Sequence, residues 1–187
     1  MASHIALLCV PMGNDHNLTV AVIGKAVGFK GEAKLHLECD FPEQFAKGTA
    51  FTTGKYDLTI QYYHPDRGVV KFVGIDSIED LQKFVNQPLL TTQEESRQRC
   101  RLAAGEYFWF DIIGLDVYED DQLLGRVDEI ERMAGTDMLL VQTAQQWVDA
   151  KLARSFLIPY LDRYILKVDQ GAKRVIVRFA KDLLEAS

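Results

Sequence analysis

Side chains able to perform acid–base or nucleophilic chemistry are few in this sequence and poorly placed. The four histidines are His4, His16, His36 and His64, so the second half has none. A Ser-His-Asp or Cys-His site would have to form around His36 or His64. His36 and Cys39 are three residues apart on an expected strand and point to opposite faces, so they cannot bind one metal as a local pair. We therefore expect no catalytic residue, no metal and no cofactor.

Two short motifs resemble ligand sites at first sight. Gly24, Gly28 and Gly31 could cradle a phosphate, but no Gly-Lys-Ser/Thr follows them and no helix pattern begins there. The acidic run Glu119–Asp121 could suggest calcium, but the ligand order of an EF-hand and its bidentate glutamate are missing. We interpret both motifs as turns of β-hairpins.

The composition is that of an ordinary soluble globular protein. The 187 residues are 48% hydrophobic and 26% charged, and no run approaches the roughly 20 apolar residues of a membrane span. The formal net charge of −6 argues against a protein that coats nucleic acid and suits a basic partner protein better. Up to Glu95 there are 8 basic and 12 acidic residues, then 13 and 15, so neither half is a basic module. Three widely spaced cysteines favour reduced thiols in the cytoplasm.

Short strands separated by turns make up the first half. An apolar run at residues 20–23 and an alternating run at 33–39 predict a hairpin around the glycine-rich loop. Ser77 can cap a short helix over residues 78–85. Further strand patterns recur about every ten residues, at residues 50–53, 58–63, 69–73 and 89–92. This spacing is typical of a small barrel, which we expect to span residues 18–92.

A polar segment of mixed charge separates the two halves. Residues 93–105 lack a strand pattern and form the predicted linker. Arg97, Arg99 and Arg101 alternate with other residues within it. Two interpretations are open: these arginines form a local basic surface that contacts RNA phosphate, or they are simply solvated.

The densest aromatic patch follows the linker. Tyr107, Phe108, Trp109 and Phe110 are consecutive, and successive side chains of a strand point to opposite faces. Two of the four should therefore face away from their own core. Such an outward pair either contacts a partner, as aromatic residues at interfaces do, or is covered by the other half of the chain.

Strand patterns continue to the end of the chain. Leu123–Ile130 follows the acidic turn, with Gly125 as the expected site of a bulge, and a polar insert covers residues 142–154. The other expected elements are strands at 138–141, 156–159, 164–168 and 174–179 and a terminal helix at 182–185. We expect a second β-rich domain over residues 106–187, and we interpret residues 1–17 as a disordered or non-native extension.

Taken together, three features resemble the bacterial ribosome maturation factor RimM family. The first is Gly24–Lys25 followed by Phe29–Glu32, which is similar to the family's Gly-Lys … Gly-Leu-Lys-Gly-Glu element. The second is Glu106–Gly114, which is similar to Glu-Tyr-Tyr-Trp-His-Asp-Leu-Ile-Gly. The third is the order of second-domain landmarks, Leu124–Gly125, Gly135–Leu139 and Leu157–Tyr160. The resemblance covers roughly residues 18–185.

The sequence departs from the family pattern in two places. The loop between Lys25 and Lys30 is shorter than usual and has Val27-Gly28 in place of His-Gly. Phe108 replaces the second family tyrosine, and Phe110 replaces the histidine, so a hydroxyl is lost while aromatic surface is kept.

The resemblance implies an all-β fold with short helices, made of two β-barrels. The first would be a six-stranded barrel like domain two of elongation factor Tu, and the second a PRC-type barrel. It also implies a non-enzymatic, cytoplasmic assembly factor that binds the immature 30S subunit through the nineteenth small-subunit ribosomal protein of the head. Such a factor assists maturation of the 16S rRNA 3′ domain, with limited direct contact to the RNA. We expect a monomer without membrane partners.

Seven residues are the predicted partner contacts. Aromatic anchors beside arginine are the usual energetic centres of an interface. One predicted surface combines Tyr107 and Phe108 with Arg99 and Arg101, and the second lies at the barrel tip, with Lys25, Phe29 and Lys30. Two other protein classes compete with this interpretation. A PRC-barrel scaffold or adaptor would leave the first-half glycine–lysine element unexplained, and an RNA-modifying enzyme would need a cofactor site.

Overall fold

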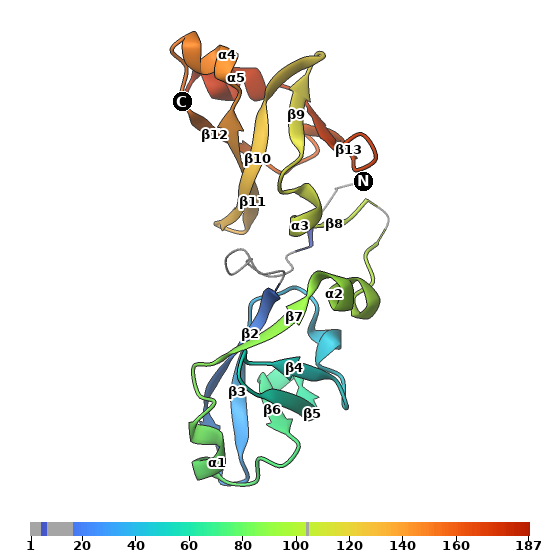
Figure 1. Ribbon diagram of the computed structural model, residues 1–187, viewed down its shortest axis with the longest axis vertical. Helices are drawn as coiled ribbons and strands as arrows, with labels where there is room; N and C mark the ends of the chain where they lie inside the picture. Colours follow the sequence, from blue (N-terminus) through green and yellow to red (C-terminus); the bar gives the residue numbers. More distant parts are fainter. Residues whose placement is uncertain (1–4, 7–16, 104) are drawn as a thin grey trace. The chain divides into compact units, whose positions relative to one another are not determined.

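The computed structural model describes residues 5–6, 17–103 and 105–187 (Figure 1). The chain divides into two compact units, one of residues 7–101 and the other of residues 1–6 with 102–187. We call them the N-terminal unit and the C-terminal unit. Among the described residues, no helix is long and apolar enough to cross a membrane.

The N-terminal unit is a closed barrel of antiparallel strands in the order β2-β3-β6-β5-β4-β7. Its strands are β2 (Asn17–Val27), β3 (Glu32–Leu37), β4 (Ala50–Thr52), β5 (Asp57–His64), β6 (Val69–Phe72) and β7 (Pro88–Thr92). Two 3-10 turns, η1 (Pro42–Phe45) and η2 (Pro65–Arg67), lie in its connections. The strands predicted for the first half are confirmed.

Alternating side chains fill the interior of this barrel. In β3, Ala33 and Leu35 are buried whereas Lys34 and His36 are exposed, as the period of two predicts. The largest fully buried side chains of the unit are Leu18, Ile23, Phe45, Ile60, Phe72, Leu81 and Leu89. Burial of each such side chain contributes about 2 kcal/mol to folding.

Helix α1 (Ile78–Gln82) lies at the barrel end that carries the β2–β3 turn (Figure 1). The Ser77 hydroxyl caps it by accepting a hydrogen bond from the Asp80 backbone N–H at 3.1 Å. The helix ends at Gln82 instead of the predicted residue 85 because the chain turns back to β2. There the Asn86 N–H, at a residue with φ of 65°, donates to the Ile23 carbonyl at 2.7 Å.

Helix α2 (Gln93–Arg99) follows the last barrel strand at the other end (Figure 1). We expected residues 93–105 to be a linker, whereas they begin with this helix, which belongs to the N-terminal unit. A capping box starts it. The Thr92 hydroxyl accepts from the Glu95 N–H, and the Glu95 carboxylate accepts from the Thr92 N–H, both at 3.1 Å. The unit ends at residue 101.

The C-terminal unit is built on a six-stranded sheet in the order β12-β11-β10-β9-β14-β13. The strands are β9 (Asp116–Glu119), β10 (Gln122–Met133), β11 (Thr136–Thr143), β12 (Ser155–Pro159), β13 (Ile165–Asp169) and β14 (Arg174–Val177). Only the pair β9–β14 is parallel. The helices α4 (Gln145–Asp149) and α5 (Ala180–Glu185) also belong to this unit. The strands and the terminal helix predicted for this half are confirmed.

The predicted bulge at Gly125 is also confirmed. The pairing of β10 with β9 shifts register between Leu123 and Gly125. A Cβ atom at Gly125 would lie 2.1 Å from the Gln142 carbonyl oxygen, so only glycine lets the two backbones approach this closely. A second register shift, between Val127 and Glu129, affects the pairing with β11.

The aromatic patch is not the continuous strand that we expected. Only β8 (Tyr107–Phe108) is extended, and helix α3 (Trp109–Ile112) follows it directly. In a helical turn residues three apart lie on one face, so Trp109 and Ile112 are both buried while Phe110 is only partly so. β8 pairs in parallel with β1 (Ile5–Ala6). That short strand falls inside the predicted extension, most of which lies outside the described residues.

Candidate partner-binding surfaces

Of the three residues predicted at the barrel tip, Phe29 and Lys30 lie in the β2–β3 turn and Lys25 lies near the end of β2. Lys25, Phe29 and Lys30 are all exposed, and Phe29 is 86% exposed. Gly28 and Gly31 flank the turn with φ of 70° and 69°, backbone values that favour glycine. We call Lys25, Phe29 and Lys30 the hairpin tip; it presents one apolar ring with two cations.

A buried lysine, Lys71, stabilises the loop that packs against the hairpin tip. A Cβ atom at Gly31 would lie 2.1 Å from the Ile75 carbonyl oxygen, so the loop after β6 packs directly against the turn. The Lys71 ammonium holds that loop by donating to the carbonyls of Phe72, at 3.2 Å, and Ile75, and by pairing with the Asp76 carboxylate at 2.8 Å. Lys71 is only 5% exposed. The role of Lys71 was not predicted from the sequence, where its one indication is a single charged residue within the apolar run of β6.

Arg99 is held inside the N-terminal unit. Its guanidinium pairs with the Glu95 carboxylate at 2.8 Å, donates to the Thr91 hydroxyl at 3.2 Å and lies over the Phe51 ring at 5.3 Å. Partial burial opposes ionisation of Glu95. Hydrogen bonds from Thr92 and Thr91 and the charge of Arg99 outweigh it and keep the pKa of that carboxyl below its usual value. These contacts fasten α2 to the barrel.

The arginine run does not form one basic surface. Arg97 and Arg99 are two residues apart on α2, so they point roughly 200° apart around the helix axis. Arg101 lies beyond the helix end and is exposed. Of the predicted arginines, Arg101 therefore offers the more accessible cation.

Tyr107 and Phe108 face different surroundings. Phe108, which we expected on the surface, is 3% exposed and stacks on Phe110 with ring centroids 4.9 Å apart. Tyr107 is half-buried, and its hydroxyl donates to the Val168 carbonyl at 3.4 Å. Phe108 points inward because α3 begins directly after it, so only Tyr107 keeps surface that a partner could reach.

Trp109 and Ile112 belong to the core. Trp109 is 4% exposed and Ile112 is fully buried. The Arg132 guanidinium lies 5.9 Å from the Trp109 ring and pairs with Asp137 at 2.7 Å. α3 is therefore a packing element.

The predicted residues fall into two units. Arg99 and Arg101 belong to the N-terminal unit with the hairpin tip, whereas Tyr107 and Phe108 belong to the C-terminal unit. Of the predicted residues, Lys25, Phe29 and Lys30 belong to one hairpin, formed by β2, β3 and their turn.

Charge is distributed unequally between the units. The N-terminal unit has 11 basic and 12 acidic residues, and the C-terminal unit has 10 and 15. Asp128, Glu129 and Glu131 are exposed together on β10, where the second register shift interrupts the regular alternation. The C-terminal unit is therefore the part of the chain suited to a cationic partner.

The two thiols in the described part of the chain, Cys39 and Cys100, are unsuited to nucleophilic chemistry. Burial raises the pKa of Cys39 to about 11 and that of Cys100 to about 12, so both are protonated at neutral pH. The Cys39 sulfur accepts a hydrogen bond from the Gln44 amide at 2.9 Å. Within the described ranges, no three His, Cys, Asp or Glu side chains are grouped to hold a metal ion.

Two family models match the chain in succession. The RimM N-terminal domain matches residues 18–96, and the RimM PRC barrel domain matches residues 109–183. The first range covers the closed barrel with the start of α2, and the second covers the six-stranded sheet. The predicted pairing of an N-terminal barrel with a PRC-type barrel is confirmed.

Full-length relatives carry one name, ribosome maturation factor RimM. The protein of Nitratiruptor sp. is 47% identical over 91% of this chain and 98% of its own length. Those of Sulfurimonas denitrificans and Sulfurovum sp. are 46% and 42% identical, over 91% and 92% of this chain and 96% and 97% of their own lengths. A solved structure of a 16S ribosomal RNA processing protein RimM from Pseudomonas aeruginosa is 22% identical, covers 89% of this chain and 99% of that one, and has a TM-score of 0.37.

Proposed function

Because the chain belongs to the ribosome maturation factor RimM family, we propose that it is a non-enzymatic assembly factor of the small ribosomal subunit. In this proposal it acts in the cytoplasm, binds the immature 30S subunit and assists maturation of the 16S rRNA 3′ domain. Its protein partner is the nineteenth small-subunit ribosomal protein of the head, and its direct contact with RNA is limited.

The unequal charge of the two units carries this proposal. Ribosomal proteins are strongly basic, and the C-terminal unit has five more acidic than basic residues. An acidic surface speeds encounter with such a protein and repels RNA phosphate. This supports protein binding through the C-terminal unit.

The hairpin tip supports a second contact through the N-terminal unit. Phe29 is an exposed aromatic ring on a turn braced by Gly31 and Lys71, and Lys30 lies beside it. A rigid aromatic with adjacent cations suits a ribosomal surface on which protein and RNA lie together. Tyr107 remains a candidate contact in the C-terminal unit, whereas Phe108 supports it from within.

Co-sedimentation with immature 30S particles tests the proposal. The intact chain should sediment with particles from cells that lack it, and a Phe29→Ala, Lys30→Ala variant should bind them roughly tenfold more weakly. Lys47→Ala, which removes an exposed lysine elsewhere on the same unit, is the matched control and should bind normally. Tyr107→Ala tests the C-terminal contact in the same assay.

The competing interpretation predicts a different result. A PRC-barrel scaffold without a ribosomal role would leave the intact chain in the soluble fraction, and loss of the chain would not change the 3′ ends of 16S rRNA. Those two observations together would reject the assembly function. Direct binding to the purified nineteenth small-subunit protein tests the named partner separately.

A further inference from the structure

An apolar strip crosses the outer face of β11 and β12. Leu140 on β11 lies opposite Leu157 on β12, and Met138 lies opposite Pro159. Directly opposed residues of an antiparallel pair share one face of the sheet, and all four of these are half-exposed. The strip is therefore accessible to a partner.

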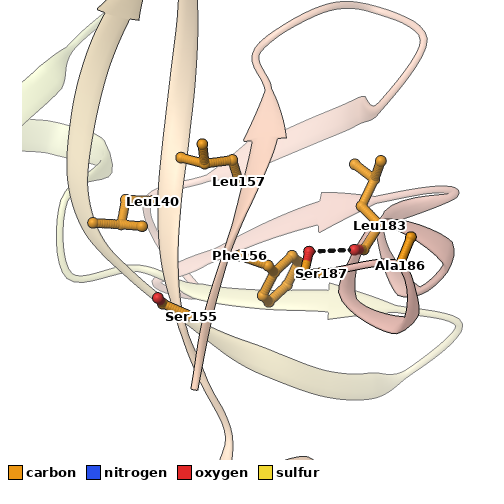
Figure 2. A pocket seen from close by; sticks show the side chains of 7 residues that line it. All are labelled: Leu140, Ser155, Phe156, Leu157, Leu183, Ala186 and Ser187. Atoms are coloured by element: carbon orange, nitrogen blue, oxygen red, sulfur yellow. Dashed lines mark hydrogen bonds between the residues drawn. The ribbon is translucent and has the colours of Figure 1, made fainter. Parts of the chain in front are cut away.

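The strip continues into a groove beside α5. The groove has a volume of about 480 Å³ and is lined by side chains of β11, β12 and α5 (Figure 2). Leu183 and Ala186 form its helix side, and the Ser187 hydroxyl, which donates to the Leu183 carbonyl at 2.6 Å, lies at its end. Its apolar floor can hold one or two aliphatic side chains.

Acidic residues stand on both sides of this groove. On the sheet side, Glu129 is the β10 partner of Leu140 and Glu131 that of Met138, and both are exposed. On the helix side, Asp182 and Glu185 of α5 are exposed next to Leu183.

Several cations lie on the elements around the groove, and one of them, Lys181 of α5, is half-buried and lies over the Trp147 ring at 4.9 Å. Arg126 and Arg132 on β10 pair with Asp116 and Asp137. Arg154 is exposed directly before Ser155, at the start of β12. The acidic rim is therefore strongest toward the Pro159 end of the strip.

The backbone of β12 adds a preference for an extended ligand. β12 is an edge strand, and Arg154 and Tyr160 exchange backbone hydrogen bonds with β11 residues. Because hydrogen-bonding direction alternates along a strand, Ser155 and Leu157 direct their backbone groups away from β11. An extended segment could pair there while placing a side chain on the apolar floor.

We propose that this groove binds an extended basic protein segment with an aliphatic side chain, contributed by a protein of the immature 30S subunit. The inference rests on the proposed function and deepens it by locating the contact. RNA does not fit, because four carboxylates around the groove would repel its phosphates. A basic segment can pair its charges with the carboxylates of the rim and place its aliphatic side chain on the apolar floor. Its backbone can form hydrogen bonds with the edge of β12.

Charge reversal on the sheet side tests the assignment. The variant Glu129→Lys, Glu131→Lys should bind immature 30S particles at least roughly tenfold more weakly than the intact chain at low salt, with a shallower salt dependence. Glu38→Lys, Glu79→Lys makes the same change of charge at exposed positions of the N-terminal unit and should not weaken binding. Leu157→Ser, which removes the apolar floor, should weaken binding roughly fivefold. Melting curves of every variant establish that it is folded.

A photoreactive benzophenone side chain at position 140 identifies the class of partner. We expect an adduct with the particle that protease removes and ribonuclease does not. An adduct that ribonuclease removes overturns the proposal, as does undiminished binding by the Glu129→Lys, Glu131→Lys variant. Equal weakening by the control pair also overturns it, because the effect would then follow net charge. If the intact chain fails to bind the particles, the proposed function fails and the groove assignment fails with it.

Discussion

The two β-rich units differ in the chemical groups that they can present to a partner. The N-terminal barrel is closed, so it has no free strand edge and can offer side chains, such as Phe29, but no row of unpaired backbone groups. The C-terminal sheet is open at β12 and offers backbone, an apolar groove and carboxylates together. Whether a sheet is closed or open therefore determines whether it can present unpaired backbone groups as well as side chains.

The largest expected effect on stability is at the buried ring of Phe108. Phe108→Ala should lower the free energy of unfolding of the C-terminal unit by about 3–4 kcal/mol, because it empties a site that is 3% exposed and stacked on Phe110. Both tryptophans, Trp109 and Trp147, belong to this unit, so urea unfolding followed by tryptophan fluorescence measures it. Phe108→Leu is the control, with a smaller loss. A loss below about 1 kcal/mol for the alanine variant would show that the ring is not part of the core.

The second prediction concerns the brace below the hairpin tip. Lys71→Ala should cost the N-terminal unit about 2–3 kcal/mol, because it removes the buried ammonium that donates to the carbonyls of Phe72 and Ile75. Amide hydrogen exchange over residues 72–76 should accelerate. Lys71→Met keeps most of the volume and should lose nearly as much, which separates hydrogen bonding from packing. Full stability of the methionine variant would show that the hydrogen bonds of Lys71 do not stabilise the unit.

The third prediction is a loss of stability at alkaline pH in the N-terminal unit. Burial raises the thiol pKa of Cys39 to about 11 and of Cys100 to about 12, above the ordinary value of 9.0. The neutral thiols therefore stabilise the fold fully below pH 9, and this contribution is lost as pH rises from 9 through 11 and 12. Between pH 8 and roughly pH 9.5 we expect a decrease on the order of 1–2 kcal/mol, which grows at higher pH. A Cys39→Ala, Cys100→Ala variant should show a flatter profile by circular dichroism; an unchanged slope would exclude the thiols as its cause.

The smallest expected effect on stability is at Phe29. Because the ring is 86% exposed, Phe29→Ala should change the free energy of unfolding by less than about 0.5 kcal/mol. Binding to immature 30S particles should nevertheless fall. A large loss of stability in the Phe29→Ala variant would show that the ring contributes to folding. Normal binding by this variant would show that the ring does not contact the partner.

Periodicity explains what the sequence predicted well. Alternation at Ala33, Lys34, Leu35 and His36 predicts β3 because one face of a barrel strand is always buried. An isolated glycine within a strand pattern predicted the bulge at Gly125, and the same residue lets β11 approach closely at Gln142.

Elements without a repeating pattern were missed. α2 has no apolar stripe, and only the Thr92 and Glu95 capping pair announces it. α3 is a single turn, too short for a periodic signal, so the inward direction of Phe108 was not predictable. The groove depends on strand register and on the docking of α5 against β12, which no local pattern encodes.

The exposed edge of β12 has a consequence for the free protein. An open strand beside an apolar groove invites another copy to pair with it and begin aggregation. Pro159 removes one N–H from this edge, and the carboxylates of Glu129, Glu131 and their counterparts on α5 repel a second acidic copy. The charges that would select a basic partner thus also keep identical chains apart, so solubility and selectivity arise from the same few side chains.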